Sequence, residues 1–113
     1  MRMKIISESL EKKEYYTNLF DFYESLFTDK QIEYFKDYYF YDLSLSEIAD
    51  NHGVSRAAIH DTISKMHNAL DNYEESLGLY KKYLSINSLC DQYSKKKDNQ
   101  ELLDFIGKIK EII

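Results

Sequence analysis

The side chains between residues 55 and 65 include the types that contact nucleic acid, and their spacing puts them on one side of a helix. Arg56 can form paired hydrogen bonds with a guanine edge or hold a phosphate, and Ser55 and Ser64 suit phosphate contacts. Asp61 can accept a hydrogen bond from a cytosine amine, but an ion pair with Lys65, four residues on, is the favoured alternative. The predicted contact set for DNA is Ser55, Arg56, Ala57, His60, Asp61, Ser64 and Lys65.

A helix-turn-helix pattern surrounds this face and would position it. Gly53 stands where the chain must turn, because a residue without a Cβ adopts positive φ most easily. We expect Val54 to fill the corner and Ser55 to cap the second helix. Ser44 and Glu47 have the spacing of a capping box that starts the first helix. The expected core contacts of the motif are Ile48, Ala49, Ile59 and Ile63. Two short helices around such a turn form the geometry that presents the second helix to a major groove.

Apolar residues at helical spacing predict two more helices before the motif. The first is expected to end near Phe27, and Thr28 with Gln31 predicts a capping box at the start of the second. The expected buried face of the first helix is Tyr15, Leu19, Phe22, Tyr23 and Leu26. The second helix is expected to bury Ile32, Phe35 and Tyr39.

After the motif, the apolar spacing predicts a long helical stalk. A repeat of 3.5 residues is the packing seam of one helix against another. The members of this seam are Ile59, Ile63, Met66, Leu70, Tyr73, Leu77, Tyr80 and Leu84. A kink or break is expected at Gly78, because glycine weakens a helix interior by ~1 kcal/mol. We expect a linker at residues 95–99. The final helix should fold back on the stalk, with an apolar stripe of Leu102, Phe105, Ile106, Ile109 and Ile113.

The composition favours one all-α domain of 113 residues. The hydrophobic content is 43%, Pro is absent and Gly occurs three times, which suits long helices and argues against a turn-rich β fold. We expect a helix-turn-helix head at residues 14–67 and long C-terminal helices at residues 68–113. No apolar run approaches the ~18 residues of a membrane span. The single cysteine, Cys90, cannot form an internal disulfide, so a reducing cytoplasm is the expected location.

The sequence has no pattern of an enzyme, and no metal or cofactor is expected. It contains no Gly-rich phosphate loop, paired catalytic carboxylates or nucleophile motif. His60 and His67 share a helical face but lie two turns apart, whereas close metal-ligand pairs are three or four residues apart. We therefore expect these two and His52 to be surface histidines. Cys90 is expected to be a small residue of the core.

The charge balance argues against very tight DNA binding. Neutralising phosphates with Lys and Arg supplies most of the affinity of DNA-binding proteins. The net charge of the chain is −5, and residues 44–78 contain two basic side chains against six acidic ones. The alternative interpretation of the face is therefore the solvated side of a packing module.

Five segments of the chain carry a distinctive pattern of residues. They are Leu19-Phe-Asp-Phe-Tyr23, Leu26-Phe-Thr-Asp-Lys-Gln31, Tyr38-Tyr39, Leu45-Ser-Glu-Ile-Ala49 and Gly53-Val-Ser-Arg-Ala57. Together they resemble the YlxM-like family of small bacterial helix-turn-helix proteins, from Leu19 to about Tyr83, and the resemblance fades after Lys95. The motif is also similar to the promoter-reading fourth region of bacterial sigma factors. The resemblance implies an all-α fold and a DNA-binding regulatory role. It also implies a link to the signal recognition particle pathway, because genes of this family tend to lie beside those of the particle.

Two functions follow as hypotheses. The first is a non-enzymatic DNA-binding regulator in which Arg56 is the leading contact. The second is an accessory factor of the secretion machinery, in which the motif is structural and a protein or RNA component of the signal recognition particle pathway is the partner. In both cases we expect a homodimer through the C-terminal half. One short helix cannot cover the whole seam from Ile59 to Leu84, and exposed apolar surface of that size marks an interface. The alternative is that the chain kinks at Gly78 and covers the seam entirely from within.

Overall fold

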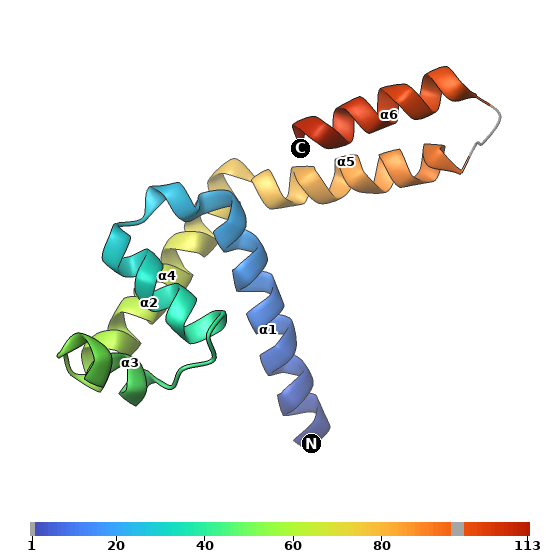
Figure 1. Ribbon diagram of the computed structural model, residues 1–113. Coiled ribbons are helices and arrows are strands. Elements are labelled where there is room, and N and C mark those ends of the chain that lie inside the picture. Colours follow the sequence, from blue (N-terminus) through green and yellow to red (C-terminus); the bar gives the residue numbers. More distant parts are fainter. Residues whose placement is uncertain (1, 96–98) are drawn as a thin grey trace. The chain divides into compact units, whose positions relative to one another are not determined.

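The computed structural model describes residues 2–95 and 99–113, with side chains described for residues 10–95 and 99–113. The elements are α1 (Arg2–Tyr23), the short 3₁₀ helix η1 (Glu24–Leu26), α2 (Asp29–Tyr39), α3 (Leu45–His52), α4 (Arg56–Leu77), α5 (Leu79–Ser94) and α6 (Gln100–Ile112) (Figure 1). No strand occurs in the two described ranges, and the all-α prediction is confirmed. None of the described helices is long and apolar enough to cross a membrane.

The chain divides into two compact units, Met1–Leu77 and Gly78–Ile113. The first contains α1 to α4, and the second contains α5 and α6. Gly78 adopts the left-handed conformation with a φ of 62°, so α4 ends at Leu77 and a new helix begins at Leu79. The break expected at this glycine is confirmed, and the long apolar seam is interrupted there. The division lies at residue 78, whereas the predicted head ends at residue 67.

Helix α4 organises the first unit, because it contacts α1, α2 and α3 (Figure 1). Its buried residues, Ile59, Ile63, Met66 and Leu70, have the predicted spacing of four, three and four. The other buried residues of this unit are Leu19, Phe20, Tyr23, Phe27, Phe35, Tyr39, Ile48 and Ala49. The rings of Phe20 and Phe35 stack with their centroids 4.1 Å apart, which joins α1 to α2.

The predicted buried face of α1 is partly wrong. Tyr15 and Leu26 are exposed, at 40% and 53% of their surface, whereas Phe20 is fully buried. The helix ends at Tyr23, and the tighter turn of η1 changes the rotation of the chain. Phe27 therefore returns to the core in the place expected for Leu26.

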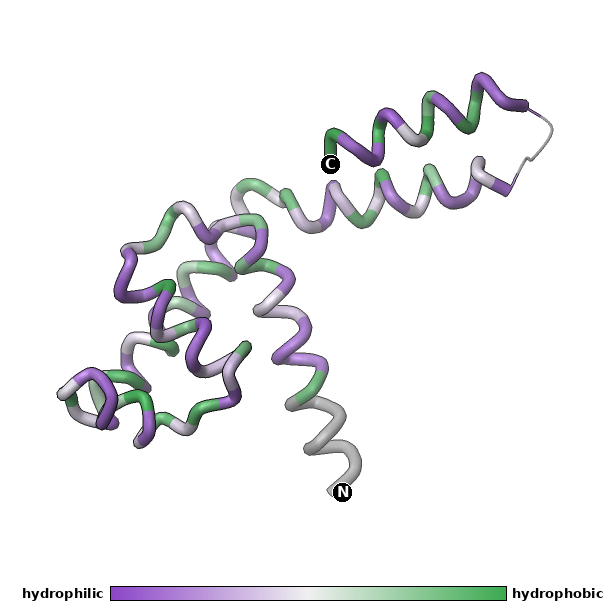
Figure 2. The backbone as a smooth tube through the Cα atoms, in the orientation of Figure 1, coloured by the Kyte–Doolittle hydropathy of each residue, from purple (hydrophilic) through white to green (hydrophobic). Residues whose placement is uncertain are grey.

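The second unit is an antiparallel helical hairpin in which α6 packs along α5, as predicted (Figures 1 and 2). Cys90 and Ile106 are buried between the two helices, and the core position expected for Cys90 is confirmed. The Asn99 side chain caps α6 by accepting a hydrogen bond from the Leu102 N–H at 3.0 Å. Of the linker predicted at residues 95–99, positions 96–98 lie outside the described residues.

Candidate nucleic-acid interface

The turn between α3 and α4 is built as the sequence predicts at its three key positions. Gly53 has a φ of +66° and ends α3 in the left-handed conformation. The Ser55 Oγ accepts a hydrogen bond from the Ala58 N–H at 3.0 Å and caps α4. Ser44 and Glu47 form the predicted capping box, with each side chain 3.1 Å from the backbone nitrogen of the other. Local hydrogen bonds therefore fix both ends of α3 and the start of α4.

Val54 does not fill the corner of the motif, and this prediction is wrong. Its side chain is 39% exposed, and its backbone N–H donates to the Ala49 carbonyl at 3.1 Å. The buried cluster of the motif is Ile48, Ala49, Ile59 and Ile63, with Tyr34, Tyr38, Leu43 and Leu45 packed against it. Val54 is not a member of this cluster.

The structure brings the predicted contact residues together at the start and along the outer side of α4. The exposed members are Ser55, Arg56, Ala57, His60, Asp61 and Lys65, and Ser64 is half-buried. Ile59, Ile63 and Met66 on the other side of the same turns are buried. The packing of the motif therefore leaves this face open to a partner.

The charge on the outer face of α4 is partly neutralised by an ion pair between two residues of that face. The Lys65 Nζ lies 2.9 Å from the Asp61 Oδ2, which confirms the ion pair expected at this spacing. Arg56 forms no ion pair with any residue that the structure describes. Arg56 is therefore the cation of this face most available to a ligand.

The first unit carries the acidic charge of the chain. Residues 1–77 contain eight basic and fifteen acidic side chains, a net charge of −7, whereas residues 78–113 contain seven basic and five acidic ones, a net charge of +2. Exposed charges more than about 8–10 Å apart are largely screened at physiological salt. The outer face of α4 therefore offers Arg56 as a local positive charge and not a basic surface.

A polar network that the sequence pattern does not predict joins α1, α2 and α4. The Tyr39 hydroxyl lies 2.6 Å from the His67 Nε2, and the His67 ring stacks on Tyr16 at 4.1 Å between centroids. The Tyr16 hydroxyl donates to the Asp71 Oδ2 at 3.0 Å. Burial lowers the pKa of His67 to about 4 and raises the pKa of Tyr39 above its usual range. At neutral pH the imidazole is therefore uncharged.

Two of the three histidines are not surface residues, so that prediction is wrong for them. His67 is half-buried, and the His52 Nε2 lies 3.1 Å from the Asp37 Oδ2 and 3.8 Å from the Glu33 Oε1, which links α3 to α2. Only His60 of the three is exposed. The described residues include no group of three His, Cys, Asp or Glu side chains that could hold a metal ion.

The network predicts a pH dependence of stability that His67 dominates. Because the pKa of His67 is about 4 in the folded chain and 6.5 for an unperturbed histidine, the unfolded chain binds the proton first as the pH falls. Stability contributed by neutral His67 is therefore complete above about pH 6.5 and is lost between about pH 6.5 and pH 4. After allowance for partial solvent access, the expected loss is roughly 1–2 kcal/mol.

Urea unfolding of wild type and His67→Gln at about pH 7 and about pH 4.5 measures this loss. Glutamine keeps a polar group beside Tyr39 but does not titrate, so the variant should lose less stability than wild type on acidification. An equal loss in both proteins would show that other groups carry the effect.

The comparison with known proteins agrees with this architecture. The model of the UPF0122 family, described as "Putative helix-turn-helix protein, YlxM / p13 like", matches residues 10–112. The chain belongs to the UPF0122 family. The resemblance to YlxM-like proteins is thereby confirmed. The match also includes α5 and α6, so the expectation that the resemblance fades after Lys95 is wrong.

Relatives of this UPF0122 protein match over most of their length. It is 40% identical over 103 residues to the UPF0122 protein of Lactococcus lactis subsp. cremoris, with 91% of each chain covered. It is 50% identical over 86 residues to a UPF0122 protein of Malacoplasma penetrans, with 76% of this chain and 77% of the relative covered. It is 39% identical over 104 residues to a UPF0122 protein of Streptococcus pneumoniae, with 88% and 94% covered.

Proposed function

We propose that this UPF0122 protein is a non-enzymatic regulator that binds double-stranded DNA through the outer face of α4. The observation that carries the proposal is the position of Arg56. It lies in the first turn of a 22-residue helix, is exposed, and has no ion pair among the described residues. In helix-turn-helix proteins the N-terminal residues of the second helix reach the edges of bases in the major groove.

The other side chains of the face have proposed parts that follow from their chemistry. Ser55 and Ser64 can donate hydrogen bonds to phosphates on either side of the groove. Lys65 is held by Asp61, so a phosphate that attracts Lys65 frees the carboxylate to accept from a cytosine amine. Since the acidic first unit gains little from general phosphate attraction, base contacts should carry an unusually large share of the affinity.

We further propose that the α5–α6 hairpin joins two copies of the chain, which would present two α4 helices to neighbouring half-sites. Cys90 and Ile106 are the buried side chains described in this unit, and units below about 40 residues usually need cross-links, metals or association for stability. An apolar hollow of about 340 Å³ runs along the hairpin. Its lining includes Leu89, Tyr93, Leu102, Phe105, Ile106 and Ile109.

A second copy of the hairpin is the occupant that fits this hollow. Phe105 and Leu89 are 60% and 56% exposed, and two-fold packing of hairpin on hairpin would bury both from each copy. This surface replaces the seam from Ile59 to Leu84 as the proposed contact. The first half of that seam is buried inside the first unit, and Gly78 interrupts the rest.

Phe105→Asp should convert the dimer to a monomer, because the buried carboxylate would have no partner in an apolar contact. Sedimentation equilibrium of the full chain at micromolar concentration should give about twice 13.5 kDa for wild type and 13.5 kDa for the variant. Ile112→Asp is the matched control, because Ile112 is 85% exposed on the same helix and does not line the hollow. A wild-type mass of 13.5 kDa, or equal masses for wild type and Phe105→Asp, would rule out this contact.

A second candidate function is an accessory role in the signal recognition particle pathway, in which the face of α4 contacts a component of that pathway. The net charge of −7 on the first unit favours it, because acidic charge opposes phosphate but suits a basic protein surface. Affinity purification of the tagged full chain, with and without nuclease treatment, tests this role. Pathway proteins retained after nuclease treatment would support the accessory function over DNA binding.

A further inference from the structure

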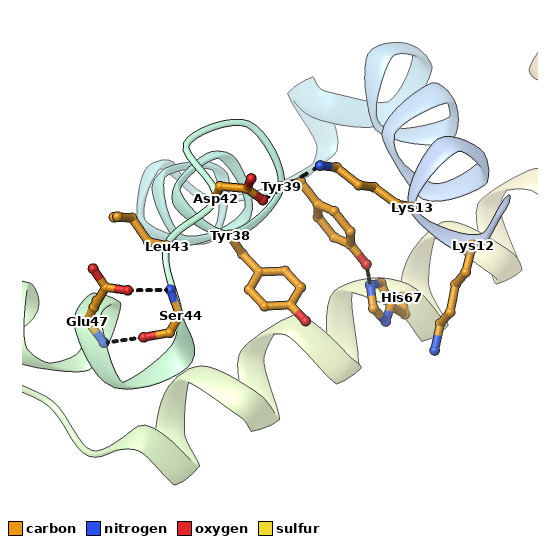
Figure 3. Close-up of a pocket in the computed structure, with 9 residues that line it drawn as sticks. All are labelled: Lys12, Lys13, Tyr38, Tyr39, Asp42, Leu43, Ser44, Glu47 and His67. Atoms are coloured by element: carbon orange, nitrogen blue, oxygen red, sulfur yellow. Dashed lines mark hydrogen bonds and ion pairs between the residues drawn. The ribbon is translucent and has the colours of Figure 1, made fainter. Parts of the chain in front are cut away.

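A hollow of about 480 Å³ opens on the first unit between α1, the loop from α2 to α3, and α4 (Figure 3). None of the residues proposed to contact DNA lines it, so it is separate from the outer face of α4. Its polar lining includes Lys12 and Lys13 from α1, Tyr38 and Tyr39 from α2, Asp42 from the loop and His67 from α4.

The carboxylates at this hollow are already engaged, whereas one ammonium group is not. The Lys13 Nζ lies 3.7 Å from the Asp42 Oδ1. The Glu47 Oε1 accepts the Ser44 N–H in the capping box. Lys12 is exposed and forms no ion pair with a side chain that the structure describes. The lining therefore has two lysines and two carboxylates, and Lys12 is the lysine that has no carboxylate partner among the described residues.

Hydrogen-bond donors from three helices face the same space. Figure 3 shows the Tyr38 hydroxyl, the His67 ring and the Lys12 ammonium group gathered above α4. The ring is a donor to this space in the tautomer in which the Tyr39 hydroxyl donates to the His67 Nε2 and the ring proton is on Nδ1. A hydroxyl, an imidazole N–H and an ammonium group are a donor set suited to an anionic oxygen group.

The wall of the hollow contains a strained residue. Asp42 is the non-glycine residue with positive φ in the described chain, at 58°. Its position is held by the ion pair with Lys13 and by a hydrogen bond of 3.0 Å from the Leu43 N–H to the Asp37 carbonyl. Strained backbone of this kind persists where the surroundings determine it and is concentrated at ligand sites.

We propose that this hollow binds a small molecule through a phosphate or carboxylate group held by Lys12, Tyr38 and His67. Such a ligand would tie α1 to α4, the helix whose outer face is proposed to contact DNA. The inference goes beyond the proposed function, because it involves no DNA contact. Asp71 of α4 is a carboxylate that acts on His67, and its Oδ2 accepts the hydrogen bond of the Tyr16 hydroxyl.

Nuclear magnetic resonance of the histidine rings tests the site with inorganic phosphate as the probe. His67 is assigned as the signal that is missing in His67→Gln. Phosphate should shift the His67 signal to saturation and raise its pKa, because an adjacent anion favours the imidazolium. Sodium chloride at equal ionic strength should leave the chemical shift of the His67 signal unchanged. A parallel titration with acetate distinguishes the two ligand classes. The anion that binds with the higher affinity shows whether the hollow prefers a phosphate or a carboxylate.

Lys12→Gln should weaken phosphate binding about tenfold, the effect of losing one charge-assisted hydrogen bond. Lys30→Gln is the matched control, because Lys30 is an exposed lysine on α2 that does not line the hollow. A His67 response equal in phosphate and chloride, or an unchanged affinity in Lys12→Gln, overturns the site. Because no DNA is present, that failure is distinct from a failure of the proposed DNA contact at Arg56.

Discussion

Gly53→Val should lower the melting temperature of the first unit by roughly 8–16 °C, which corresponds to a loss of about 2 kcal/mol in a small domain. The φ of Gly53 is +66°, a conformation that a β-branched residue rarely adopts. No atom lies within 4 Å of a Cβ built at this position, so the cost arises in the backbone and not from a collision. Neighbouring side chains therefore cannot relieve it by moving.

Gly107→Val is the matched control for this substitution. Gly107 lies in α6, has open space around it and does not have positive φ. Valine has a somewhat better helix propensity than glycine, so this variant should be no less stable than wild type. Circular dichroism melts of the three proteins make the comparison. If Gly53→Val had the same melting temperature as wild type, the turn between α3 and α4 would be wrongly described.

Arg56→Ala should weaken binding to a preferred DNA sequence by roughly 5–150-fold, equivalent to about 1–3 kcal/mol. The folded state should be nearly unaffected, because the side chain is exposed and outside the core. Arg56→Lys keeps the charge but loses the paired hydrogen bonds to a guanine edge. If that variant binds as weakly as Arg56→Ala, the arginine reads a base and does not merely hold a phosphate.

Fluorescence anisotropy with a sequence selected from genomic DNA by the purified chain measures these affinities. Lys30→Ala serves as the control for loss of one exposed positive charge in the same unit. Equal affinities for wild type and Arg56→Ala would remove Arg56 from the interface and favour the accessory function.

Features encoded within four or five residues were predictable from the sequence. The capping boxes at Ser44 and Thr28 form as expected, because each needs only a side chain and a backbone N–H three residues away. The same holds for the turn at Gly53 and for the ion pair between Asp61 and Lys65. The outer face of α4 follows from helical periodicity once its buried face is known.

Features that depend on packing between helices were not predictable in this way. The exposure of Leu26 depends on η1, whose tighter turn has no clear sequence signal, and the burial of Phe20 depends on its packing against Phe35 of α2. His67 lies beside Met66 in the apolar repeat, which hints at partial burial. Its partners Tyr16 and Tyr39 are far away in sequence, so only the fold brings them together. The hollow with Lys12 at its edge depends on the same long-range packing.

The salt dependence of DNA binding tests the central claim most directly. Each neutralised phosphate contributes about −0.9 to the slope of log K against log salt concentration. Arg56 and Lys65 from each of two copies are available to neutralise phosphates, so we expect a slope of roughly −2 to −4 for the selected sequence. The chain should also bind the selected sequence more tightly than a scrambled duplex. An affinity that does not change with salt, or equal binding to both duplexes, would contradict a role of α4 in reading DNA.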